Sequence, residues 1–90
     1  MSPFGNTMRL IDHEQPRLRT IALGPDAAGI GRTLASLNLD ALHVRVTAVR
    51  RKGERDPKPS GEMRLREGDV IVLLATQENL AKAEIRLLQG

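Results

Sequence analysis

The sequence predicts a small α+β domain, with helices packed on one side of a mostly antiparallel sheet. Two stretches alternate polar and apolar residues as half-buried strands do, one stretch is apolar throughout, and the C-terminal stretch repeats apolar residues at helical spacing. We therefore expect the order strand, helix, strand, short strand, strand, helix. The chain has 90 residues, enough for one domain. We assign residues 17–90 to this domain and residues 1–16 to a linker or disordered arm.

The first predicted strand covers residues 18–23, where Leu18 and Ile21 are expected on opposite faces. A short helix follows from about Gly31 to Asn38, because apolar residues recur there at i, i+4 and i+7. Asn38 tolerates the left-handed backbone conformation that often ends a helix.

The second predicted strand begins near Val44. Val44, Val46 and Ala48 alternate with polar neighbours, so we expect these three side chains on one buried face. Glycine and proline residues then interrupt regular strand pairing. A short extended piece at residues 63–65 precedes a tight turn.

Residues 70–75 are apolar at every position, so neither face of this segment is expected to contact water. The pattern predicts a central strand, or a strand whose second face is covered by another subunit. Thr76 is placed to cap the final helix, which carries a wide apolar stripe through Leu88.

A glycine-rich turn at residues 24–34 lies between the first strand and the first helix, an arrangement that often binds phosphate. Ile30 and Gly31 stand where a Walker loop has its lysine and hydroxyl residue. Leu34 stands where a dinucleotide fingerprint has its third glycine. Since both patterns fail at necessary positions, we interpret these glycines as residues that shape a loop.

The net charge is +3, and the basic excess is concentrated in residues 50–58. This stretch contains no aromatic residue to stack on bases, so we interpret it as a solvated loop rather than a nucleic-acid site. The chain has no cysteine, which excludes disulfides and thiolate metal sites. It has neither an apolar run of the roughly 20 residues that a membrane helix needs nor a secretory signal. We expect a cytoplasmic protein, at the cytoplasmic face of the inner membrane if it is part of a transporter.

Three sequence features occur in the order in which one known family has them. GIGRTLASLNL contains a Gly-x-x-Leu-x-x-Leu helix, VRVTAVRR is a strand that ends in Arg-Arg, and LREGDVIVLLA has a Gly-Asp turn before an apolar strand. Over residues 18–89 the chain resembles the TrkA-C family, the C-terminal domain of regulators of potassium conductance (RCK). It is most similar in character to the C-terminal regulatory domains of Kef-type cation–proton antiporters.

The resemblance implies a non-enzymatic, ligand-sensing homodimer that regulates a bacterial potassium or other monovalent-cation transport or antiport system. The implied partner is a membrane-embedded transport domain of the same or another chain. A regulatory ligand would bind in a cleft between two copies, and in some family members this ligand is cyclic di-adenosine monophosphate (c-di-AMP). The family positions that hold it correspond here to Asn38, Leu39, Asp40, Arg45 and Thr47.

Asp40 departs from the family pattern, because ligand-binding members tend to have a basic residue at this position. A carboxylate there is expected to repel a bis-phosphate. Two alternative functions remain open: a structural dimerisation module without a ligand, and a nucleic-acid-binding module that uses residues 50–58.

Single polar residues are better explained by structure than by chemistry. We expect Asp69 to cap a turn through backbone amides, His43 to lie partly exposed at a strand end, and His13 to belong to the N-terminal arm. No pattern of nucleophile, base and acid is present. The sequence therefore predicts no catalytic residue, no cofactor and no metal site.

Overall fold

The computed structural model describes residues 15–53 and 58–90. Most of the expected N-terminal arm, with His13, and residues 54–57 of the basic stretch lie outside this part of the chain. The elements are β1 (Arg17–Ala22), α2 (Leu34–Leu37), the 3-10 helix η1 (Leu39–Leu42), β2 (Arg45–Arg50), β3 (Val70–Ala75) and α3 (Gln77–Leu88).

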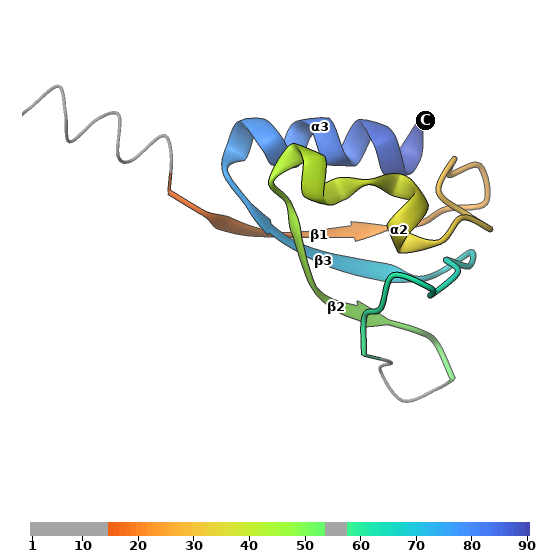
Figure 1. The fold of residues 1–90 in the computed structure, drawn as a ribbon. Helices are drawn as coiled ribbons and strands as arrows, with labels where there is room; N and C mark the ends of the chain where they lie inside the picture. The colour runs from red at the N-terminus through yellow and green to blue at the C-terminus, as the bar shows by residue number, and fades with distance from the viewer. Residues whose placement is uncertain (1–14, 54–57) are drawn as a thin grey trace, which may run out of the picture.

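The strands form one antiparallel sheet in the order β1-β3-β2. The apolar strand β3 is therefore central, which confirms the expectation from its sequence. Figure 1 shows α3 and the α2–η1 segment on the same side of this sheet. The fold is the predicted small α+β domain, with helices on one face of an antiparallel sheet.

The predicted short strand at residues 63–65 is not part of the sheet. It makes a single antiparallel bridge, between Thr33 and Arg64. Residues 61–63 instead accept hydrogen bonds from the first N–H groups of α2. The N–H of Leu34 donates to the carbonyl of Met63 at 3.0 Å, and the N–H of Ala35 donates to the carbonyl of Gly61 at 2.9 Å. The first N–H groups of a helix have no partner inside the helix, so a neighbouring chain segment can take them.

A β-bulge in β2 overturns the strict alternation expected for this strand. Val46 pairs with Leu73 and Ala48 pairs with Val72, so the register shifts at Thr47. Because an extra residue reverses the order of faces, Ala48 lies on the opposite face from Val46. Val49 takes the buried position instead and is fully enclosed.

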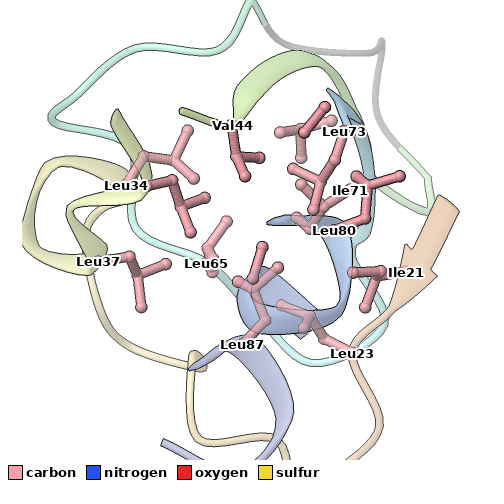
Figure 2. Close-up of a cluster of buried hydrophobic side chains, with 14 residues drawn as sticks. Ile21, Leu23, Leu34, Leu37, Val44, Leu65, Ile71, Leu73, Leu80 and Leu87 are labelled. Atoms are coloured by element: carbon pink, nitrogen blue, oxygen red, sulfur yellow. The ribbon is translucent and has the colours of Figure 1, made fainter. Parts of the chain in front are cut away.

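The core lies between the helices and the inner face of the sheet (Figure 2). Leu37 from α2, Leu73 from β3 and Leu80 from α3 are each at most 1% exposed. Burying a side chain of this size contributes about 1.5–3 kcal/mol. Leu65 inserts from the loop that precedes β3 and fixes this loop against the core.

The final helix begins and packs as predicted. The hydroxyl of Thr76 accepts the N–H of Asn79, which caps the first turn of α3. Leu80, Ala83 and Leu87 are buried, whereas Ile85 is 53% exposed, so the buried stripe is narrower than the apolar stripe. Within residues 15–53 and 58–90, no helix combines the length and apolar composition needed to span a membrane.

Candidate functional site

A cavity of about 330 Å³ opens between α2, η1 and the start of β2. The loop at Pro59–Gly61 forms its fourth side. One carboxylate and one guanidinium stand against otherwise apolar or small neighbours in its wall. The lining residues are Leu34, Ala35, Leu39, Asp40, Arg45, Val46, Pro59, Ser60 and Gly61.

Three of the five predicted ligand residues line this cavity, namely Leu39, Asp40 and Arg45. Asn38 does not line it, but it forms the junction between α2 and η1. Thr47 does not line it either. Its hydroxyl donates to the carbonyl of Val72 at 3.2 Å, within the sheet at the bulge.

Two residues with left-handed backbone conformations set the direction of η1. Asn38 has φ 52° and His43 has φ 57°, one at each end of the 3-10 helix. The conformation predicted for Asn38 is therefore present. His43 is exposed at the entry to β2, as expected, but its positive φ was not predicted. This conformation costs free energy in residues other than glycine, and backbone strain of this kind is concentrated at functional sites.

Arg86 of α3 anchors the same junction from the other side. Its Nη1 donates to the carbonyl of Leu37 at 3.0 Å and to that of Asn38 at 3.3 Å. A cation at a helix C-terminus pairs with carbonyls that have no partner inside the helix. Arg86 therefore connects the C-terminal helix with the segment that carries Leu39 and Asp40.

The central amides of the glycine-rich turn are already engaged by the protein's own backbone. The backbone N–H groups of residues 27–32 all donate to carbonyls of the protein, including those of Leu87 and Leu88 at the end of α3. The turn comes close to the end of α3 at Gly29. A Cβ at this position would lie 3.1 Å from the backbone oxygen of Leu87, so a glycine is required here. The loop caps α3, and this supports the interpretation of its glycines as structural.

Asp69 and Arg51 form a buried ion pair that the sequence predicted only in part. Asp69 is 1% exposed. Its carboxylate accepts the N–H of Arg66 at 2.8 Å, as predicted for a turn cap, but it also accepts two hydrogen bonds from Arg51, at 2.9 and 3.0 Å. The prediction that Arg51 lies in a solvated loop is wrong, because its side chain is only 13% exposed.

Burial raises the pKa of the Asp69 carboxyl, but its surroundings reverse the effect. The hydrogen bonds from Arg51 and Arg66, together with their positive charges, hold its pKa below the ordinary value. The group is thus a carboxylate at neutral pH, committed to joining the end of β2 to the start of β3. Such a pair is a structural clamp rather than a catalytic acid.

The face of the sheet opposite the helices contains a further candidate surface. Cross-strand pairing defines its three rows, and we call this surface the outer face. Leu18 on it is 66% exposed, and the three β3 side chains are half-buried in the single chain. The rows are Leu18–Leu74–Arg45, Thr20–Val72–Ala48 and Ala22–Val70–Arg50.

Within the part of the chain that the structure describes, no group of three or more His, Asp or Glu side chains could hold a metal ion.

Comparisons with known proteins agree with this architecture. The family model of the TrkA-C domain matches residues 18–87. The protein named "Putative K(+) efflux antiporter KefB" of Alkalimonas amylolytica is 30% identical over 83 residues, which are 92% of this chain and 13% of that protein. The chain thus spans about an eighth of the length of this relative.

Solved structures show the same fold. The RCK C domain of the potassium transport protein KtrA, in complex with c-di-AMP, superposes with a TM-score of 0.68 over 93% of this chain and 95% of that one, at 16% identity. The RCK domain of GsuK superposes with a TM-score of 0.63 over 91% of this chain and 18% of that one, at 21% identity. The chain belongs to the TrkA-C domain family.

Proposed function

We propose that this chain is the dimeric, ligand-sensing regulatory domain of a bacterial potassium efflux or cation–proton antiport system, and that it acts without catalysis. The cavity beside η1 is the observation that carries the proposal, because it places Asp40 and Arg45 in one wall. Membership of the TrkA-C family and the similarity to a KefB antiporter support the transport assignment.

The mechanism is a shift between two arrangements of the dimer. A ligand that contacts the cavity differently in the two arrangements favours one of them by the difference in binding free energy. The N-terminal segment, which we propose as a linker over residues 1–16, transmits this preference to a membrane-embedded transport domain on the cytoplasmic side. Arg86 ties the junction between α2 and η1 to α3, so a displacement of this junction is communicated to α3.

The charge of the cavity restricts the ligand. KtrA binds c-di-AMP in the superposed structure, but here Asp40 brings a negative charge to the cavity wall. A carboxylate facing a phosphate is repelled, whereas a guanidinium forms charge-assisted hydrogen bonds with it. We therefore propose that the unmodified chain prefers a ligand other than a bis-phosphate.

Titration calorimetry of the chain with c-di-AMP, potassium ions and a random oligonucleotide tests these assignments. We expect weak or no binding of c-di-AMP, and a gain of roughly tenfold or more in Asp40→Arg, since one charged hydrogen bond contributes about 1.5–3 kcal/mol. Asp26→Arg is the matched control, because it makes the same charge change at an exposed turn outside the cavity.

Tight binding of c-di-AMP by the unmodified chain would contradict the role given to Asp40. No heat with any of these ligands favours the purely structural dimerisation module. Tight oligonucleotide binding that weakens steeply with salt favours a nucleic-acid module. Arg51, within the basic stretch, is already engaged by Asp69, which argues against this last alternative.

A further inference from the structure

We propose that the cavity beside η1 takes a small zwitterion, with its primary ammonium on Asp40, its carboxylate on Arg45 and a compact apolar body against the apolar walls. This inference rests on the proposed function and specifies the chemical class of the ligand. It follows from the charges, the size and the walls of the cavity.

The backbone fixes the two residues that carry the charges. Asp40 lies in the first turn of η1, and Arg45 is the first residue of β2, where it pairs with Leu74 of the central strand. His43, with its left-handed φ of 57°, turns the chain between them. The two charges thus come from two different elements that meet at the cavity. A ligand bonded to both would hold η1 against the sheet.

The side chains of Asp40 and Arg45 are both open to a ligand. In the part of the chain that the structure describes, they make no hydrogen bond and no ion pair, either with each other or with another residue. By contrast, Arg19, Arg51 and Arg86 all donate to an oxygen atom of the protein. The two charges in the cavity wall therefore lack the partners that these other arginines have.

The lining has no net charge, and this selects the charge of the ligand. Its described residues include one carboxylate, one guanidinium and no other ionisable group. An anion would bond Arg45 but lie close to the carboxylate of Asp40, and a cation would meet the same repulsion from Arg45. A zwitterion gives each group a partner of opposite charge, and such charge-assisted hydrogen bonds are stronger than neutral ones.

The other walls and the size of the cavity restrict the body of the ligand. Leu34 and Leu39 are 8% and 4% exposed, so they form a packed apolar wall, and Val46 and Pro59 also line the cavity. The volume of about 330 Å³ is at the lower end of the range for small-molecule sites. A compact apolar body therefore suits this cavity.

The wall chemistry favours a primary ammonium over a quaternary one. A quaternary ammonium has no N–H to donate and is recognised by aromatic faces. None of the described lining residues is aromatic, and the one aromatic residue of the sequence, Phe4, lies outside the described part. A primary ammonium instead donates hydrogen bonds to carboxylate oxygens such as those of Asp40. On the anionic side, the planar guanidinium of Arg45 matches the geometry of a carboxylate.

Leucine and two analogues that each lack one of its charges test this proposal on the whole chain. Isoamylamine is leucine without the carboxylate, and isocaproate is leucine without the ammonium. Titration followed by amide NMR measures each dissociation constant and shows which backbone amides respond. We expect leucine to bind at least about tenfold more tightly than either analogue, with the largest shifts at Leu39, Asp40 and Arg45.

Two variants should exchange these preferences, an effect that misfolding cannot mimic. Asp40→Asn should weaken leucine binding about fivefold or more but strengthen isocaproate binding, because it removes the carboxylate that repels this probe. Arg45→Gln should weaken leucine binding but strengthen isoamylamine binding for the converse reason. Asp26→Asn and Arg50→Gln make the same charge changes outside the cavity, and should leave every dissociation constant within about twofold.

The outcomes separate this ligand class from the proposed function. Equal binding of the three probes, or leucine binding that neither Asp40→Asn nor Arg45→Gln weakens, overturns the zwitterion site. The absence of any amide shift with leucine at roughly 50 mM overturns it too. The regulatory function still stands in these cases if potassium or c-di-AMP gives heat in calorimetry, and it falls if those ligands are silent as well.

Discussion

At the scale of single residues, Asp69 shows how a turn preceding a central strand is held. Its carboxylate bonds a backbone amide of its own turn and a guanidinium from the end of β2. Removing one partner of such a buried pair leaves the other charge uncompensated, which costs more than the pair itself contributes. The pair therefore fixes the meeting of β2 and β3 at the end of the sheet.

The low pKa of Asp69 predicts a loss of stability in acid. A carboxyl whose folded-state pKa lies below its unfolded value binds a proton first in the unfolded chain. Its contribution is complete at neutral pH and is lost as the pH falls below about 4 towards the folded-state pKa. Urea unfolding between pH 7 and pH 2.5 should show this decline.

Asp69→Asn should lower the free energy of unfolding by about 3 kcal/mol at pH 7 and flatten its decline in acid. Glu67→Gln, an exposed acid in the same turn, is the control and should change little. An acid profile as steep in Asp69→Asn as in the unmodified chain would show that other carboxylates dominate.

Gly68, in the same turn, has φ 86° with nothing within 4 Å of the position that a Cβ would occupy. Gly68→Ala should therefore cost about 1–2 kcal/mol through backbone strain alone. Gly24→Ala is matched, since a Cβ there also meets open space but its φ is not positive. Equal melting temperatures for the two variants would contradict the requirement for glycine at residue 68.

At the scale of elements, the sequence predicts a structural feature best where that feature requires a particular residue type at one position. Thr76 before a helix and Gly68 in a tight turn are such cases, and β3 is central because no polar residue interrupts it. The bulge at Thr47 was missed because alternation in β2 continues through it in the sequence. A register shift depends on the neighbouring strand, which local spacing does not describe.

The cavity and the clamp were predicted only in part for the same reason. Leu39, Asp40 and Arg45 were expected at the site, but the loop at Pro59–Gly61 that closes it binds α2 from a distance in sequence. Arg51 could have been assigned once β2 and β3 were paired, because Arg50 pairs with Val70 and the next residues are Arg51 and Asp69. The pairing of Arg50 with Val70 therefore predicts that Arg51 and Asp69 lie next to each other.

The contact between α3 and α2 also belongs to the scale of elements, and it is testable. Arg86→Gln removes the charge that bonds the carbonyls of Leu37 and Asn38, and should lower the free energy of unfolding by about 1–2 kcal/mol. Lys82→Gln on the same helix removes only an exposed pair with Glu78 at 4.0 Å and should cost less than about 0.5 kcal/mol. An equal loss in the free energy of unfolding in both variants would contradict the proposed contribution of Arg86 to holding α2 against α3.

At the scale of the whole molecule, a chain this short has little apolar surface to bury on its own. Small domains are marginally stable, and association often supplies what a single core cannot. The helical layer covers one face of the sheet, and the outer face offers the remaining apolar area. Stability and dimerisation are therefore expected to be coupled in this chain.

This coupling predicts that the melting temperature depends on chain concentration. In the proposed dimer only folded chains associate, so mass action would stabilise the folded state by an amount that grows with the logarithm of concentration. Scanning calorimetry from roughly 5 to 500 µM should show a rise of several degrees for the unmodified chain. Leu18→Arg adds a charge to the outer face and should show a smaller rise, whereas Ile85→Arg, on α3, should match the unmodified chain. A melting temperature that stays constant over this range would mean that the native chain unfolds as a monomer, and the coupling of stability to the outer face would fail.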